Sequence, residues 1–241
     1  MKLILCSEDD AAAAWVYATL LSLGCSDLEL VTSRDLAYAT QWSHRVTSDN
    51  CAVEIHLQDQ RRIHLRSVDG VINRFCWPSR AMIGRATRED QDYAWSEMFA
   101  FYLSWLHALP GKVFNRATPQ GLCGTWRSAA QWMLLAGQAG FYVEPCCGSG
   151  MGWERPPEEG RQLTQVVVFE GRPFGLTGIG EIEAACRKLF DLTGTSLLGI
   201  ELYASKGNRW TFHNATPLPD LCAGGVGLME EIRKSWSEGV C

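Results

Sequence analysis

The first part of the chain alternates between apolar, strand-like runs and segments with helical spacing. Leu3-Ile4-Leu5 is continuously apolar, as expected of a strand that is buried on both faces. Residues 11–23 then carry a helical pattern, and Asp9 or Asp10 is in place to cap that helix. Residues 28–32 form a second strand pattern. We expect these segments to fold as a parallel strand–helix–strand unit.

The next region reads as a short helix followed by a hairpin. Ser33 is in place to cap a helix from about residue 34 to residue 42. Two runs of alternating apolar and polar residues, 52–57 and 61–65, are then separated by Gln58-Asp59-Gln60. This spacing predicts a β-hairpin.

A long amphipathic helix is predicted after the hairpin. Thr87-Arg88-Glu89-Asp90 has the form of a capping box, and the helical pattern continues from there through Ala108. The aromatic residues along this segment recur at helical spacing, which is typical of a stripe that faces a core. A strand at 112–115 follows, and Thr125 is then in place to cap a helix that runs to about Gln138.

Glycine and proline mark a boundary in the middle of the chain. The segment 141–145 is predicted to be a strand that completes a second strand–helix–strand unit, and a Gly- and Pro-rich stretch follows it. We therefore expect an α/β lobe over residues 1–145, a connection over 146–162 and a second lobe over 163–241.

The second lobe shows a denser pattern of strands. The segments 165–170 and 172–176 flank Gly171 as a hairpin, and helical spacing follows over 181–192. Two strands, 197–203 and 209–214, and a closing helix over 226–236 complete the lobe.

Composition excludes several classes of protein. With 241 residues, of which 46% are hydrophobic, the chain can bury a large core. Its net charge of −5 disfavours a broad nucleic-acid interface, which needs clustered Lys and Arg. The apolar start is too short for a secretory signal, and no apolar run is long enough to cross a membrane. A cytoplasmic location is therefore expected.

The cysteines point to a reducing compartment. The chain has ten, and no two of them have CxxC spacing. Most are expected to be small buried hydrophobes. Cys146 and Cys147 are the exception, because they lie beside a Gly-rich loop, and a metal or redox role for them stays open. A cysteine nucleophile paired with one of the five histidines is a further alternative.

The end of the second lobe carries the motif that is closest to known chemistry. Two strand-like segments, Leu198–Leu202 and Arg209–Asn214, lead into Ala215-Thr216-Pro217-Leu218-Pro219-Asp220. This arrangement resembles the metal-binding end of an ATP-grasp ligase. In that family the first strand supplies an acidic residue and the second a Glu-x-Asn pair, and these residues hold magnesium against ATP.

The resemblance extends to the glutathione-synthetase-like ATP-grasp proteins, including those that modify peptides. It implies an α/β protein with a Rossmann-like pre-ATP-grasp lobe and a reduced ATP-grasp-like α+β lobe without the lid subdomain. It makes Glu201 and Asn214 candidate ligands of Mg²⁺, and Arg127 and Asn214 candidate contacts of ATP. Strand alternation predicts that His213 and Asn214 point to opposite faces, with Asn214 toward the cleft.

The departures from the family pattern bear on activity. Phe212 stands in the glutamate position, and a phenyl ring cannot ligate a hard cation. The stretch before the second lobe begins with Arg127-Ser128 instead of an Asp-Lys pair, and the connection 146–162 contains no lysine. Phosphoryl transfer depends on such cationic contacts. The family lid, with its lysines, is expected to be absent.

Two functions follow from the resemblance. The first is a non-catalytic, pseudoenzyme-type subunit that binds a peptide or protein partner, such as an enzyme of a peptide-modifying pathway, and needs no cofactor. The alternative is an ATP-dependent carboxylate–amine ligase that uses ATP and Mg²⁺ and is completed by a partner chain.

A Gly121–Gly124 turn before the Thr125 helix is a further candidate, for binding an anion.

Overall fold

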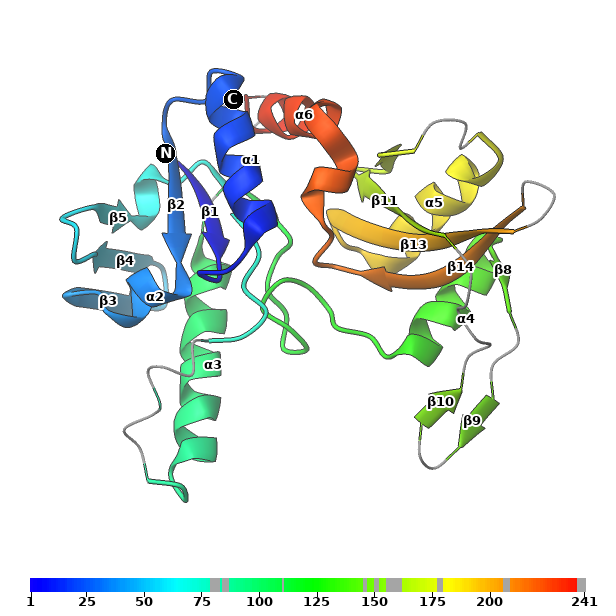
Figure 1. Cartoon of the computed structure of the whole chain (residues 1–241). Helices are drawn as coiled ribbons and strands as arrows, with labels where there is room; N and C mark the ends of the chain where they lie inside the picture. The colour runs from blue at the N-terminus through cyan, green and yellow to red at the C-terminus, as the bar shows by residue number, and fades with distance from the viewer. Residues whose placement is uncertain are drawn as a thin grey trace. The chain divides into compact units, whose positions relative to one another are not determined.

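A computed structural model shows two compact units, each with its own sheet and core (Figure 1). It describes residues 1–78, 83, 87–109, 111–144, 147–149, 152–154, 162–176, 180–205 and 209–237. Unit 1 comprises Met1–Thr125 together with Met229–Cys241, and unit 2 comprises Trp126–Leu228. No helix in these described ranges has the length and apolar character needed to span a membrane.

Unit 1 is built on a four-stranded parallel sheet in the order β2-β1-β6-β7. Its strands are β1 (Lys2–Cys6), β2 (Leu28–Thr32), β6 (Gly70–Asn73) and β7 (Lys112–Phe114). Helix α1 (Ala11–Ser22) connects β1 to β2, and Asp10 caps it by accepting a hydrogen bond from the Ala13 amide at 3.0 Å. The predicted strand–helix–strand unit is confirmed, and of the two candidate caps the helix uses Asp10.

A second, antiparallel sheet lies in the same unit. It contains β3 (Gln41–Val46), β4 (Cys51–His56) and β5 (Arg62–His64), and β4 and β5 form the predicted hairpin. Of the helix expected over 34–42, only the first part forms, as α2 (Ser33–Ala37), and β3 begins inside the expected range at Gln41. A single turn of 3-10 helix, η1 (Leu65–Ser67), follows β5.

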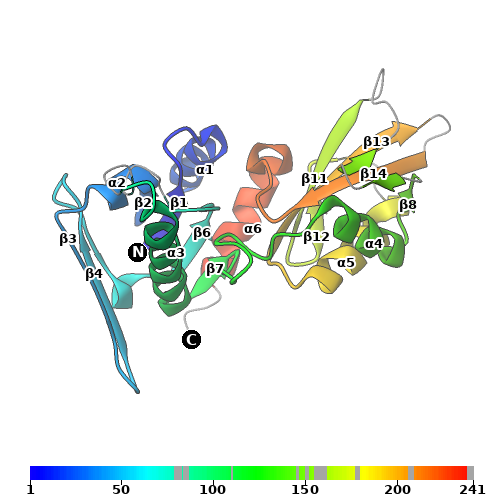
Figure 2. The ribbon, with the colours of Figure 1, turned by 90° about the horizontal axis from the view of Figure 1, so that it is seen from below.

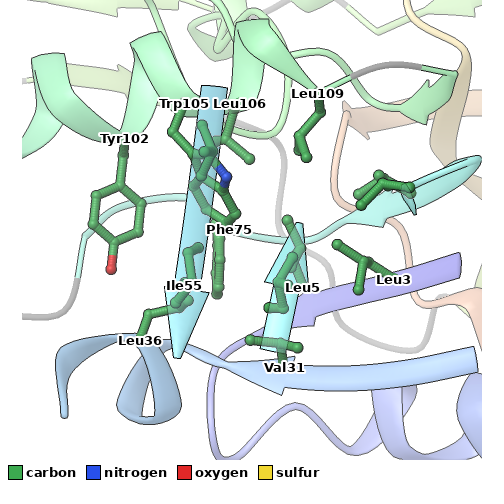
Figure 3. Close-up of a cluster of buried hydrophobic side chains, with 14 of the residues drawn as sticks. Leu3, Leu5, Val31, Leu36, Ile55, Phe75, Tyr102, Trp105, Leu106 and Leu109 are labelled. Carbon is green, nitrogen blue, oxygen red and sulfur yellow. The ribbon is translucent and has the colours of Figure 1, made fainter. Parts of the chain in front are cut away.

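Helix α3 (Gln91–Ala108) packs against both sheets of unit 1 (Figures 2 and 3). Trp105 and Tyr102 on α3 are fully buried, and Trp42 of β3 packs edge-on against both rings at 5.1 and 5.4 Å. The C-terminal part of the predicted aromatic stripe faces this core, whereas Tyr93 near the start of α3 is 70% exposed. The buried side chains that share this core include Leu3, Leu5, Val31, Leu36, Ile55, Phe75, Leu106 and Leu109.

The last helix, α6 (Gly225–Ser237), reaches the parallel sheet with its C-terminal part. The ring of Trp236 is 1% exposed and stacks on Phe114 at 6.3 Å. Gly70 of β6 lies directly beneath the indole, since a Cβ atom added there would be 2.3 Å from Trp236 Nε1. Only glycine allows this close approach of helix and strand.

Unit 2 contains a five-stranded sheet in the order β12-β11-β13-β14-β8. Its strands are β8 (Tyr142–Val143), β11 (Leu163–Phe169), β12 (Arg172–Phe174), β13 (Leu197–Ser205) and β14 (Arg209–Thr216). All neighbours pair antiparallel except β14 and β8, which are parallel. A separate hairpin, β9 (Cys147–Ser149) and β10 (Gly152–Glu154), and a 3-10 turn, η3 (Leu221–Gly224), complete the unit.

Two helices cover one face of this sheet. Helices α4 (Ala129–Ala139) and α5 (Gly180–Thr193) bury Trp132, Ala136, Cys186 and Leu189 against the strands. From β13 and β14 the core receives Ile200, Leu202 and Phe212.

Strand β8 does not complete a second strand–helix–strand unit in the first lobe, as the sequence pattern suggested. It pairs instead with β14, and α4 packs in the core of unit 2, so the contacts divide the chain after Thr125. The expected connection, 146–162, lies mostly outside the described residues. The domain boundaries 1–145, 146–162 and 163–241 therefore stay a prediction.

Candidate functional site

The structure brings Glu201 and Asn214 together as a cross-strand pair. Glu201 on β13 is the direct register partner of Asn214 on β14. Side chains at such paired positions lie on the same face of a sheet, with Cβ atoms about 5 Å apart. Both side chains are half-buried. The two candidate metal ligands that lie 13 positions apart in the sequence (214 − 201) thus share one surface.

A β-bulge determines which side chains join this pair. Register pairs Leu202 with Phe212 but Glu201 with Asn214, so His213 is an extra residue on β14. The centres of the His213 and Tyr203 rings are 4.8 Å apart. Tyr203 and Glu201 lie two positions apart on β13, so their side chains are on the same face of the sheet. His213 and Asn214 therefore lie on the same face. The expected alternation of these two residues is wrong, because the bulge interrupts the two-residue period.

The same bulge leaves Phe212 on the other face. Phe212 is 4% exposed and packs in the core of unit 2, with its ring 5.7 Å from that of Phe141. Its register partner Leu202 is buried in the same core. The side chain at position 212, where the resemblance expects a glutamate, is therefore a buried phenyl ring that faces away from Glu201.

A third polar residue extends the pair across the sheet. Gln165 on β11 is the register partner of Glu201, so Gln165, Glu201 and Asn214 form a row over three strands. The Gln165 Oε1 atom accepts a hydrogen bond from the Asp220 amide at 2.9 Å, which holds the segment after β14 against this row. Within the described part of the chain, no hydrogen bond or ion pair engages the side chain of Glu201 or Asn214. We name these three residues the polar row.

The polar row offers few ligands to a metal ion. Among the described residues, no group of three or more His, Cys, Asp and Glu side chains is placed to hold a metal. Glu201 and Asn214 supply one carboxylate and one amide oxygen, and His213 adds an imidazole, which magnesium does not favour. The residues present therefore do not fit a magnesium ion that needs a second carboxylate from β14.

Arg127 lies in the helix layer of unit 2. Its guanidinium donates to the Thr193 carbonyl at 3.0 Å, at the end of α5, and lies 5.1 Å from the ring centre of Trp132. Partial burial lowers the pKa of this guanidinium. Since α4 and α5 cover the face that buries Phe212, the structure does not bring Arg127 to Glu201 and Asn214.

The Gly121–Gly124 segment does not begin a helix. It forms a turn in which the Gly121 amide donates to the Thr118 carbonyl at 3.0 Å. Helix α4 begins after Ser128, which forms a capping box with Gln131. The expected Thr125 cap is wrong, because Ser128 and Gln131 satisfy the amides at the helix start. The anion-binding interpretation of the glycine turn loses its helix N-terminus.

A cysteine and a histidine meet in the antiparallel sheet of unit 1. Cys51 Sγ lies 3.8 Å from His44 Nδ1, and His44 Nε2 lies 2.8 Å from Ser104 Oγ. Burial lowers the pKa of His44. A hollow of about 330 Å³ does open on this sheet, but it is lined by residues of the opposite face, such as Arg45 and Glu54. This hollow therefore does not open onto the Cys51–His44 contact. Cys146 and the side chain of Cys147 lie outside the described part.

Sequence reasoning did not identify Gln165, His213 and Tyr203 as members of this surface. A correct register between β11 and β13 would have identified Gln165, since it stands opposite Glu201. The bulge that turns His213 to this face has no signal in the sequence, because a β-bulge depends on how two strands pair.

Comparison with solved structures identifies the fold of this chain. No protein-family model matches the chain, and no curated protein matches it in sequence. The macrocyclase MdnC of Microcystis aeruginosa MRC, bound with the precursor peptide MdnA, aligns with a TM-score of 0.68 at 11% identity, over 91% of this chain and 92% of MdnC. The ATP-grasp ligase PsnB, complexed with minimal precursor, Mg and ADP, aligns with a TM-score of 0.67 at 11% identity, over 98% of each chain.

A third structure agrees with these two. The RiPP-associated ATP-grasp ligase of Chryseobacterium gregarium, in complex with ADP and a leader and core peptide, aligns with a TM-score of 0.64 at 11% identity, over 98% of this chain and 94% of the ligase. At such identities the likeness shows the fold. The ATP-grasp-like α/β fold expected from the resemblance is confirmed, whereas the absence of a lid stays a prediction.

Proposed function

We propose that this chain, whose fold is that of ATP-grasp ligases solved with precursor peptides, is a non-catalytic subunit that binds a peptide or protein partner in a peptide-modification pathway. One observation carries the proposal. The strand position where the resemblance requires a metal-binding glutamate holds Phe212, which is buried in the core on the far side of the sheet. The fold is retained, but a carboxylate needed at the metal is missing.

Charge supports the same interpretation. Activation of a phosphoryl group requires cationic side chains and metal against the developing negative charge. Arg127, the candidate phosphate contact, is bonded to the Thr193 carbonyl. The connection 146–162 has no lysine, and the part of it that the structure describes includes the short hairpin β9–β10. We propose that the lid subdomain is reduced to this connection.

The peptide part of the proposal is supported by the likeness to MdnC, PsnB and the Chryseobacterium gregarium ligase, which were solved with peptides bound. Exposed aromatic side chains suit such an interaction, since aromatic residues dominate binding hot spots. Trp77 and Tyr93 of unit 1 and Trp126 of unit 2 are all more than half exposed. A cytoplasmic location belongs to the same proposal, since the seven cysteines described in the structure are free thiols.

The first prediction concerns nucleotide binding. Isothermal titration of the full chain with Mg-ATP should give no binding with a Kd below about 1 mM. The physical reason is that Glu201 and Asn214 offer too few oxygen ligands to hold a metal-bridged triphosphate. Clear micromolar binding, with ADP released when a peptide is added, would contradict the proposal.

The alternative is an ATP-dependent carboxylate–amine ligase completed by a partner chain. The observation in its favour is the cross-strand pairing of Glu201 with Asn214, whose side chains are half-buried and engaged by no described hydrogen bond or ion pair. ATP and Mg²⁺ would be its cofactors. A partner would have to supply the missing ligand and the cationic contacts.

The second prediction separates these two functions. In a pathway assay with all partner enzymes present, the double variant Glu201→Ala/Asn214→Ala should support the same yield of modified peptide as the native chain. The circular dichroism spectrum and melting temperature serve as controls for folding. A yield that falls by about 100-fold or more with the fold intact would identify the chain as the ligase, since losing metal ligation removes several kcal/mol of transition-state stabilisation.

A further inference from the structure

Two cysteines that are 47 positions apart meet in unit 1. Cys76 follows β6, Cys123 lies in the segment after β7, and their Sγ atoms are 3.6 Å apart. Both segments follow the carboxyl ends of neighbouring parallel strands. In open α/β sheets this edge is where functional groups gather. We name these residues the thiol pair.

Buried hydrogen bonds hold the two segments that carry the thiol pair. Asn73, which is 2% exposed, donates from Nδ2 to the carbonyls of Asn115 and Leu122. Its Oδ1 accepts from the Phe75 amide at 3.2 Å. One side chain thus joins the residue before Cys76 to the residue before Cys123. The contact between the sulfur atoms is therefore part of the fold.

The two thiols differ in their electrostatic surroundings. A hydrogen bond from Cys123, with help from the positive charge of Arg74, lowers the pKa of Cys76. The same hydrogen bond and burial raise the pKa of Cys123. Arg74 is itself held by Asp10, whose carboxylate lies 2.7 Å from its Nε and 3.1 Å from its Nη2. Cys76 is the thiol that ionises more readily.

The two thiols also differ in their exposure to solvent. Cys76 is partly exposed and its neighbour Trp77 is 52% exposed, whereas Cys123 is 2% exposed. A small molecule from solution can therefore reach Cys76 before Cys123. Among the cysteines that the structure describes, Cys6 and Cys186 differ from Cys76, because burial raises their pKa values to about 12.

We propose that Cys76 and Cys123 form a reversible redox pair, in which Cys76 attacks a low-molecular-weight disulfide and Cys123 resolves the product. The Cys76 thiolate attacks one sulfur of the small disulfide, and the other sulfur leaves as a thiolate. The Cys123 thiol then loses its proton and attacks Cys76 Sγ, which forms the Cys76–Cys123 disulfide and releases a second small thiolate. One small disulfide is reduced to two thiols and two protein thiols are oxidised, so the exchange balances.

The experiment uses the full chain and oxidised glutathione as the probe. After incubation in glutathione buffers of rising oxidised fraction, the protein is quenched with acid, alkylated and digested with trypsin. Cleavage after arginine yields peptides 75–80 and 117–127, each with a single cysteine, Cys76 and Cys123. We expect mass spectrometry to find these two peptides linked in oxidised samples and separate after reduction.

Single variants test the order of the steps. Cys123→Ser should trap one glutathionyl group on Cys76, and Cys76→Ser should leave Cys123 unmodified under the same conditions. Cys222→Ser is the matched control, because Cys222 is exposed and should not affect the Cys76–Cys123 link. Circular dichroism spectra verify that the variants fold.

The proposal is overturned if the peptides with Cys76 and Cys123 stay unlinked in a buffer that already glutathionylates Cys222. This test uses the native chain alone. It is also overturned if Cys123 in Cys76→Ser reacts as fast as Cys76 in Cys123→Ser. Oxidation should further raise the melting temperature by about 5 °C, since a cross-link over a loop of this length restricts the unfolded chain. An unchanged melting temperature in a fully linked sample would contradict the geometry on which the pair is based.

Discussion

Replacing Phe212 by glutamate is expected to lower the free energy of unfolding by about 4 kcal/mol or more, and to leave the affinity for Mg²⁺ unchanged. The substitution restores the residue type that the family resemblance requires at this position. It places the carboxylate in the core, however, because Phe212 packs against Phe141 and pairs with buried Leu202. Losing a buried phenyl ring costs about 3–5 kcal/mol, and a buried carboxyl adds to that cost.

The pH dependence of this variant follows from burial. A carboxyl group in an apolar core has a raised pKa in the folded state. The variant is therefore destabilised most at pH values at which this carboxyl group is ionised in the unfolded chain. The loss of stability should therefore grow as the pH rises above about 4.3, the usual pKa of glutamate. Urea unfolding at several pH values, followed by tryptophan fluorescence, measures it.

His213→Glu is the matched control, since it introduces the same side chain one position away. His213 is half-buried on the face of Glu201 and Asn214, so this variant should lose no more than about 1–2 kcal/mol. It also places a second carboxylate beside the polar row, and titration should detect Mn²⁺ or Mg²⁺ binding that the native chain lacks. Equal stability of the two variants would show that the bulge does not separate positions 212 and 213.

Gly70→Ala should destabilise unit 1 by about 3 kcal/mol. A Cβ atom at this position would lie 2.3 Å from Nε1 and 2.4 Å from Cδ1 of Trp236. The indole is 1% exposed and stacks on Phe114, so the ring has little room to move. Forcing extra atoms into a packed core costs about 1–3 kcal/mol, or more where neighbours cannot shift. Urea unfolding with circular dichroism detection gives the difference.

Gly137→Ala is the control for Gly70→Ala. Gly137 lies inside α4, and a Cβ atom there would meet no atom within 4 Å. Alanine favours a helix over glycine by about 1 kcal/mol, so this variant should be as stable as the native chain or more stable. A double-mutant cycle with Trp236→Leu attributes the cost at Gly70 to the indole. If the cost of Gly70→Ala persisted in that background, the contact would not be its cause.

Local patterns predicted most elements because their signals lie within short stretches. The apolar run Leu3-Ile4-Leu5 lies in β1, the helical spacing after Asp10 is α1, and Trp105 of the aromatic stripe of α3 is buried. Each depends on a period of two or 3.6 residues or on a capping side chain. The resemblance also selected Glu201 and Asn214 as candidates, and the structure places these two residues opposite each other on adjacent strands.

Predictions failed where long-range pairing decided the outcome. The helix expected over 34–42 ends at Ala37, and β3 begins at Gln41. Trp42 of this strand packs against Trp105 of α3, which lies far along the chain. Strand β8 joined the sheet of unit 2 because β14, more than sixty residues later, offered an open edge. Local propensity is a weak determinant where tertiary packing competes with it.

The sequence by itself predicted most of the elements and the ATP-grasp-like order in which they follow one another, and it has Phe212 where the resemblance expects a carboxylate. Only the tertiary structure decided that Phe212 faces the core, that His213 joins Glu201 and Asn214, and that Cys76 touches Cys123. The reason is physical. Periodicity and caps act between neighbours in the chain, whereas a bulge, a strand register and a contact between two loops arise only when distant segments pack together.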